Sequence, residues 1–249
     1  DDDLNINDMG YQARNNLSKL RAVTRYTQTD FPQTSKILER GYKLFFVKET
    51  DTHGLQLSQA AEFEFKQTFK NTSGFEIEFR QWASGNDDLL TRGSALAPFV
   101  KLGQGRKFEL TYSGRQNERW SYWAHLERKR QSFQSFTASS NVIALGGYYY
   151  PSDDLKFGIH LGKANSKNWH NWLGDNRIGV YPLDYFSIMV NATWFPKENH
   201  ELRIKYQTTV MEAETGAEWL ADSIGNLNPA NTSAAGFDLG QLAFQIRYK

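Results

Sequence analysis

Histidines are the side chains of this sequence with the widest chemical range, because an imidazole can bind a metal ion or act as a general base. The chain has five of them: His53, His125, His160, His170 and His200. None shows His-x-x-x-His spacing or a neighbouring carboxylate cluster of metal-ligand type. Cysteine is absent, which excludes disulfides, thiolate metal sites and cysteine nucleophiles. The spacing therefore predicts no metal site and no cofactor.

A hydrolytic triad could be written from Ser166, His160 and Asn165, as lipase-type barrel enzymes use a serine, a histidine and an amide. Nothing in the spacing of these three residues selects them over other combinations. We therefore predict no catalytic residue and expect that the protein is not an enzyme.

Four carboxylates, Glu62, Glu64, Glu76 and Glu78, alternate with apolar residues over 61–66 and 75–80. They could serve as paired catalytic acids. The competing interpretation is a hairpin with one apolar and one charged face, because strand side chains alternate between the faces of a sheet. Cross-strand salt bridges to basic neighbours would then line a polar lumen. We favour the lumen, and the lumen-facing candidates are Glu62, Glu64, Lys66, Glu76, Glu78, Arg80, Arg203, Lys205 and Arg247.

The segment 164–184 reads as a long loop that carries Trp169, His170, Trp172 and Asp175. Exposed tryptophan beside polar side chains can stack on a sugar ring and form hydrogen bonds with it, so these four residues are candidates for a ligand-binding loop. The alternative is an aromatic cap that packs only its own loop, or part of an interfacial aromatic girdle, and we favour this alternative.

Period-two alternation recurs along the whole chain, and convincing amphipathic helices are missing. We predict about eleven strands, at 14–28, 36–49, 61–66, 75–80, 99–113, 119–132, 141–150, 155–163, 184–195, 200–211 and 237–249. Short links alternate with mostly longer ones, the latter at 83–98, 133–140, 164–184 and 212–236, the last expected as a mobile loop. Such sorting of connections is typical of outer-membrane barrels, which have short periplasmic turns and long external loops.

Composition agrees with a barrel. The 29 basic and 28 acidic residues nearly cancel, so a nucleic-acid partner is not expected. Mean hydropathy is −0.64 and no apolar run approaches the length of a membrane-spanning helix, but a barrel exposes only alternate residues to lipid. Aromatic residues make up 14%, and several fall near strand ends, where a headgroup girdle is expected: Trp120, Tyr122, Trp123, Tyr148, Tyr149, Tyr150, Tyr181, Tyr185, Trp194 and Phe195.

Two short motifs resemble recurrent signatures of an uncharacterised bacterial family. They are Asn7-Asp8-Met9-Gly10-Tyr11, followed by Arg14-Asn15, and the segment from Asp87 to Gly93. In that family a module similar to a family-9 carbohydrate-binding domain precedes a C-terminal outer-membrane barrel. The resemblance implies that this chain is the barrel portion and that further strands follow Lys249. The family has no established reaction, so no catalytic residue is carried over. Within the second motif, Arg92-Gly93 is a candidate for folding inward to plug the lumen.

The sequence therefore predicts an all-β, transmembrane, antiparallel, up-and-down barrel in the bacterial outer membrane. We expect residues 1–249 to form one domain, a piece of a longer protein with at least twelve strands. A pore or transport role and a membrane anchor for a sugar-binding module are the leading functions. A barrel-embedded hydrolase and a soluble carbohydrate-binding β-sandwich are the alternatives. The expected partners are outer-membrane lipid and lipopolysaccharide, a saccharide ligand, and the barrel-assembly machinery during insertion.

Overall fold

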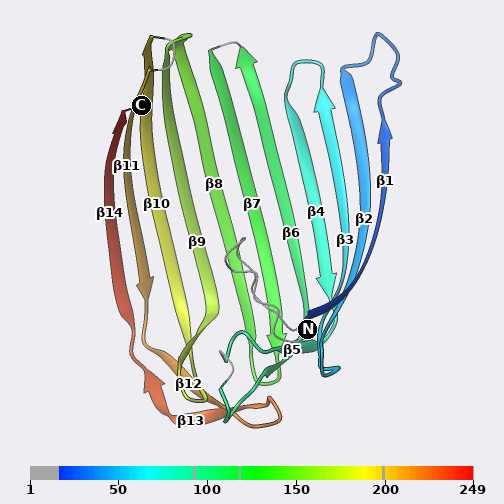
Figure 1. Cartoon of the computed structure of the whole chain (residues 1–249), viewed down its shortest axis with the longest axis vertical. Coiled ribbons are helices and arrows are strands. Elements are labelled where there is room, and N and C mark those ends of the chain that lie inside the picture. The colour runs from blue at the N-terminus through cyan, green and yellow to red at the C-terminus, as the bar shows by residue number, and fades with distance from the viewer. Residues whose placement is uncertain (1–16, 92–93, 118, 198–199, 249) are drawn as a thin grey trace.

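The computed structural model describes residues 17–91, 94–117, 119–197 and 200–248, which form a single antiparallel sheet (Figure 1). Eleven strands follow one another across this sheet in the order β1-β2-β3-β4-β6-β7-β8-β9-β10-β11-β14. Every neighbouring pair is antiparallel. Most neighbours are also consecutive in the sequence; β5 comes between β4 and β6, and β12 and β13 come between β11 and β14. The prediction of an all-β, antiparallel, up-and-down fold with about eleven strands is confirmed.

The strands differ in length, and three short ones lie off the main path. Their bounds are β1 Leu17–Gln28, β2 Ile37–Asp51, β3 Gln56–Phe69, β4 Gly74–Trp82, β5 Gly85–Asp87, β6 Val100–Asn117, β7 Trp120–Phe133, β8 Thr137–Ser152, β9 Leu155–Gly174, β10 Arg177–Lys197, β11 His200–Ala213, β12 Gly216–Ala221, β13 Leu227–Ala234 and β14 Phe237–Tyr248. No helix long and apolar enough to cross a membrane occurs among these described residues.

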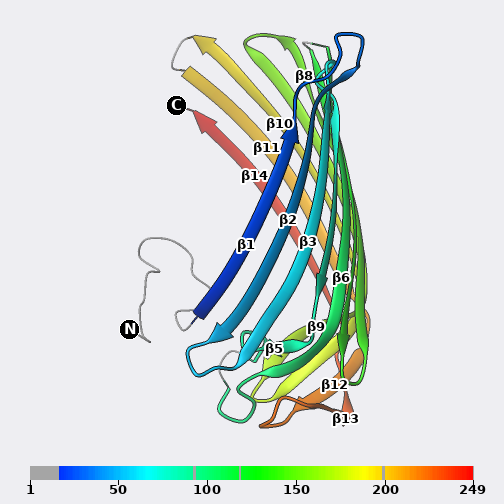
Figure 2. The ribbon, with the colours of Figure 1, turned by 90° about the vertical axis from the view of Figure 1, so that its right-hand side faces the viewer.

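The sheet is strongly curved (Figure 2), and its two faces differ in chemistry and in crowding. Glu62 and Phe63 are neighbours on β3 and point to opposite faces. Glu62 is 9% exposed, whereas Phe63 is 40% exposed. Side chains on the inner side of a curved sheet converge and those on the outer side spread apart. We therefore assign the charged side chains to the concave face and the apolar ones to the convex face.

The apolar band on the convex face runs obliquely to the rows of paired residues. One row passes from Leu44 through Phe63, Phe79 and Phe108, and continues to Asn141, Asn165 and Asp184. The same row is thus apolar on β2 to β6 and polar on β8 to β10. On β14 the band has shifted toward the end of the strand, at Leu242, Phe244 and Ile246. A band that drifts in this way means that the strands are tilted against it, as they are in barrels.

Tyrosines and tryptophans of the convex face gather near the ends of the strands with the short turns. Trp120 of β7 stacks on Tyr149 of β8 with ring centroids 4.3 Å apart. Tyr112 and Tyr122 lie 5.8 Å apart on β6 and β7. Trp194 of β10 is also exposed there. The predicted girdle needs a correction, because Trp123, Tyr148, Tyr150 and Tyr185 lie on the concave face and Tyr181 is buried at the opposite end of the sheet.

Connections at the other end of the sheet, where β5, β12 and β13 lie (Figure 1), differ from those expected. The predicted loop 164–184 is strand along nearly its whole length, since β9 and β10 continue to a tight turn at Asp175-Asn176. The predicted mobile loop 212–236 is largely the β12–β13 hairpin, which pairs with β10. The loop expected at 133–140 is reduced to a short turn between β7 and β8.

These segments form what we call the cap, which consists of β5, the described residues of 88–99 and the β12–β13 hairpin. The tip of the hairpin reaches β6, where the Lys101 backbone N–H donates to the Gly225 carbonyl at 2.8 Å. Ser135 Oγ donates to the Leu227 carbonyl at 2.7 Å, so the hairpin also contacts the β7–β8 turn. A buried apolar cluster holds the cap on the sheet; its members are Ala97, Val100, Phe133, Ala138, Ile178, Val180, Ala221 and Leu227.

Of the two motifs that resemble the bacterial family, the structure describes only part of the second. Residues 7–15 and Arg92-Gly93 lie outside the described residues. The described part of the second motif begins the cap, because Asp87 Oδ1 accepts hydrogen bonds from the backbone N–H groups of Leu89 and Leu90 at 2.9 and 3.0 Å. Thr91 is fully buried. This motif thus makes a turn that directs the chain from β5 into the cap.

The sheet has two lateral edges, formed by β1 and β14 (Figure 1). Among the residues that the structure describes, β1 pairs only with β2 and β14 pairs only with β11. The outer edge of each of these strands therefore presents backbone N–H and C=O groups available for further pairing.

Candidate functional site

A row of four carboxylates crosses the concave face from β3 to β7. The register places Glu64 opposite Glu78, Glu78 opposite Glu109, and Glu109 opposite Glu127. Directly opposed residues on antiparallel strands have Cβ atoms about 4.5–5.5 Å apart, and like charges in such positions repel. The row is extended on β2 by a cation, Lys43, which lies opposite Glu64. A line of like charges of this kind needs cations supplied from the sides.

A second row, directly beside the first, supplies such cations. Arg80 lies opposite Lys107, and Lys107 opposite Lys129, on β4, β6 and β7. Lys107 Nζ lies 2.8 Å from Glu78 and 2.9 Å from Glu109. On the β2 side, Lys43 Nζ lies 3.0 Å from Glu62 and 2.6 Å from Glu64. Lys43 therefore meets Glu64 directly across the strands and Glu62 diagonally. Lys107 instead meets Glu78 diagonally and Glu109 along its own strand, because like charges lie directly opposite it.

All nine predicted lumen-facing residues lie on this concave face, but they do not form one group. Glu62, Glu64, Lys66, Glu76, Glu78 and Arg80 lie on β3 and β4. Arg203, Lys205 and Arg247 lie on β11 and β14, with Arg203 opposite Arg247. Ion pairs between strands are present: Arg80 contacts Glu62 at 3.8 Å, and the shorter ion pairs of Glu62, Glu64 and Glu78 are with Lys43 and Lys107. Arg203 pairs with Glu201 on its own strand.

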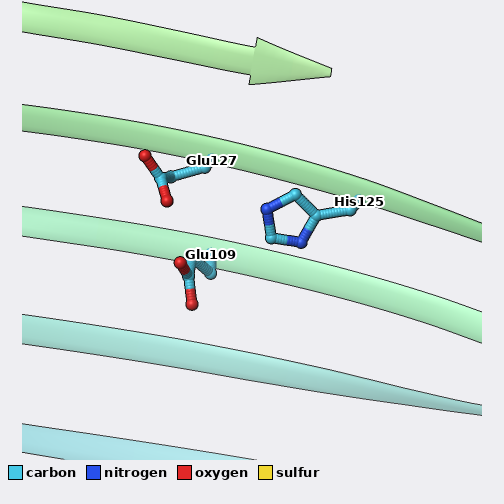
Figure 3. A group of neighbouring side chains, drawn as sticks. All are labelled: Glu109, His125 and Glu127. Atoms are coloured by element: carbon cyan, nitrogen blue, oxygen red, sulfur yellow. The ribbon is translucent and has the colours of Figure 1, made fainter. Parts of the chain in front are cut away.

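The sequence argument missed a cluster on β6 and β7 (Figure 3). Single ligand atoms of Glu109, His125 and Glu127 all lie within 4.8 Å of one another. His125 and Glu127 are two residues apart on β7, so both point to the same face. Glu109 comes from the neighbouring strand, and only the β6–β7 register brings it here. The signal in the sequence was the His-x-Glu alternation on one strand, and the missing information was the register.

A hollow of about 450 Å³ lies where the concave face meets the cap. Its polar lining combines Lys129 and Gln131 of β7, Ser140 of β8, Ser166 of β9 and Asp87 of the cap. Apolar groups also contribute, among them Phe133, Tyr185 and Met211. The hollow is therefore continuous with the basic row, and a polar solute there would meet both a cation and hydrogen-bonding groups.

Of the four residues predicted as a ligand-binding loop, Trp169 and His170 on β9 line the hollow, whereas Trp172 and Asp175 are not among its lining residues. Trp169 packs against Tyr181 and Phe237, each at 6.0 Å between ring centroids. His170 packs edge-on against Phe133 at 4.8 Å. Trp172 Nε1 donates to the Asp175 carbonyl at 3.4 Å. The first two side chains thus pack the end of the sheet and the cap, and their role as sugar ligands stays a prediction.

The triad residues considered above are not assembled. Ser166 and His160 lie six residues apart on β9, which is about 20 Å along a strand. Asn165 points to the convex face, where its Oδ1 accepts a hydrogen bond from Asn141. Ser166 Oγ donates to the Ser139 carbonyl at 3.1 Å. The arrangement therefore has no nucleophile hydrogen-bonded to a base at this place.

We expect His170 to make the stability of the cap depend on pH. It lies beyond the apolar band, and burial lowers the pKa of its imidazole, while a backbone hydrogen bond with Asn168 opposes this effect. The folded state therefore disfavours the proton, and the unfolded state binds it more readily below about pH 6.5. We expect full cap stability above that pH and a progressive loss below it. Hydrogen exchange of residues 133–136 and 176–180 at several pH values measures this.

The variant His170→Phe keeps a ring against Phe133 and removes the titration, so it provides the control. After correction for the intrinsic pH dependence of amide hydrogen exchange, the protection of its cap should be the same at pH 7.5 and pH 5.5. An unchanged pH dependence in this variant would show that another group is responsible.

No protein-family model matches the sequence. No curated protein matches it at a significant level. Among solved structures, the ferric yersiniabactin uptake receptor of Yersinia pestis is similar with a TM-score of 0.48 and 10% sequence identity. The match covers 93% of this chain and 43% of the receptor chain, so this chain spans less than half the length of that structure.

Proposed function

We propose that this chain is part of a bacterial outer-membrane β-barrel whose concave, charged face lines an aqueous pore for small polar solutes. The observation that carries the proposal is the pairing of an exposed apolar convex face with a charged concave face on the same strands. In this arrangement the short turns face the periplasm and the cap faces outward. Outer-membrane lipid and lipopolysaccharide are the partners of the convex face, and the barrel-assembly machinery is its partner during insertion.

The dimensions of the apolar band support a membrane location. On β10 the convex apolar residues run from Phe186 to Trp194. This run spans nine residues, and a tilted strand needs about 9–11 residues to cross a bilayer. In a soluble β-sandwich, a second sheet would cover the apolar face. Here Phe63, Phe79 and Phe108 of that face remain exposed.

A barrel in lipid must also be closed, because no water is available to the backbone groups of an open edge. We propose that further strands pair with the outer edges of β1 and β14. The tilt of the strands against the apolar band supports closure, since a sheet closes into a barrel only with tilted strands.

Single-channel conductance of the full-length protein in a planar lipid bilayer tests the pore. We expect steady conductance, and block by a saccharide would identify that class of solute. Lys107→Gln should raise cation selectivity, because it removes the charge that neutralises Glu78 and Glu109. Lys163→Gln, on the convex face, is the matched control and should leave the reversal potential unchanged.

A membrane anchor that displays a sugar-binding module is the second candidate function. Two observations favour it: many concave charges pair with one another, and the cap packs across one end of the sheet through a buried cluster. Stable insertion without current in the same experiment would exclude the pore and support the anchor. Both candidates are non-catalytic roles.

A further inference from the structure

We propose that Glu109, His125 and Glu127 bind a divalent transition-metal cation on the concave face, with Zn²⁺ as the simplest probe. The proposal rests only on the β6–β7 register and the side chains on it, so it does not depend on the membrane location or on the pore. The His-x-Glu spacing on β7 supplies two of the three ligands, and only the register supplies Glu109.

The first argument is the orientation of the imidazole. His125 Nδ1 lies 3.0 Å from Thr111 Oγ1, the residue directly opposite on β6. This hydrogen bond holds the ring and leaves Nε2 to face the side on which the two carboxylates lie (Figure 3). A metal-binding histidine commonly has its second ring nitrogen fixed by such an outer hydrogen bond. Thr111 is thus a positioning residue for the ligand.

The second argument is the unbalanced charge of the two carboxylates. Glu109 lies directly opposite Glu127, and Glu78 lies on the other side of Glu109 in the same row. Lys107 Nζ contacts Glu109 Oε1 at 2.9 Å, and the carboxyl groups of Glu109 and Glu127 share a side-chain hydrogen bond, whose place a divalent ion would take. No cation lies within ion-pair distance of Glu127 among the residues that the structure describes. A divalent ion between the carboxylates would relieve their mutual repulsion.

The ligand set selects the class of cation. One imidazole and two carboxylates suit Zn²⁺ and other first-row divalent ions, whereas Mg²⁺ and Ca²⁺ prefer sites made of oxygen alone. Three protein ligands leave at least one coordination position open to water or to a solute. A cation here would be exchangeable and would offer a positive anchor for an anionic group of a passing solute.

The test uses the full chain folded in detergent micelles, with Zn²⁺ binding measured by calorimetry and Co²⁺ binding by visible absorption. We expect one site, and a loss of affinity of about tenfold or more in His125→Ala. Because the removal of a ligand could disturb the fold, Thr111→Val is the second variant. It keeps all three ligands and should weaken binding by about tenfold.

His160→Ala is the matched control, since His160 also lies on the concave face but packs between Trp123 and Tyr148 instead of carboxylates. It should bind Zn²⁺ like the unmodified chain. Equal Zn²⁺ affinity in His125→Ala and the unmodified chain would overturn the proposal, as would displacement of Zn²⁺ by an equal concentration of Mg²⁺. Either result would mean that only the acidic row attracts cations.

Discussion

Replacing Ile188 with arginine should reduce the stability of the membrane-inserted protein by about 2–4 kcal/mol, the cost of a charged side chain on the lipid face near the midplane. Ile188 lies on the convex face near the middle of the apolar band of β10, between Phe186 and Val190. Its cross-strand neighbours on this face are Leu161 and Thr208. An arginine there has no nearby carboxylate and would have to reach the headgroups.

The preceding residue provides the control. Ser187 lies on the concave face, opposite Gly162 and Thr209. Ser187→Arg introduces the same charge one residue away, in a polar environment, and should fold and insert almost normally. Reversible urea unfolding in lipid vesicles measures both variants. Equal insertion and stability of Ile188→Arg and the unmodified protein would show that the convex face does not meet lipid.

The second large effect is expected in the cap. Ile178 of β10 is 0% exposed and belongs to the apolar cluster beneath the β12–β13 hairpin. It lies opposite Trp172 of β9 and Trp219 of β12, so it is enclosed from both neighbouring strands. Ile178→Ala would leave a cavity in a rigid environment, and such substitutions cost about 2–5 kcal/mol.

This loss should be local, because β3 and β4 contribute no residue to the apolar cluster that holds the cap. We expect faster hydrogen exchange in residues 216–234 and unchanged exchange in β3 and β4. Leu173→Ala on β9 is the control, since Leu173 is 36% exposed and its truncation leaves no enclosed cavity. If both variants exchange alike in residues 216–234, Ile178 does not hold the cap.

The sequence was sufficient for the strands in which alternation is unbroken. In β3 and β4 every second residue is apolar from Phe63 to Phe65 and from Phe75 to Phe79, and a one-residue shift would exchange the two faces. The extension of β9 and β10 was missed because the alternation is interrupted there. Asn168 has a positive φ of 59°, and the register shifts between Tyr181 and Leu183 around Pro182. These irregularities change which face the next side chains occupy.

For the candidate sites, the sequence likewise predicted the face of each residue but not its partners. The face on which Glu62, Glu64 and Glu78 lie follows from alternation alone. Their ion-pair partners do not, because Lys43 and Lys107 come from other strands and only the register between strands brings them close. The Asp87 turn and the β12–β13 hairpin also could not be predicted from the sequence. Their apolar residues are few, and they form a core only when segments distant in sequence come together.

By itself, the sequence determined that the chain forms antiparallel strands with one apolar and one charged face, because side-chain alternation is a local property with a period of two residues. Only the tertiary structure decided the row of four carboxylates, the approach of Glu109 to His125 and Glu127, and the cap across one end. These features depend on register between strands, which is set by the turns and bulges of the whole sheet and cannot be read from any one strand.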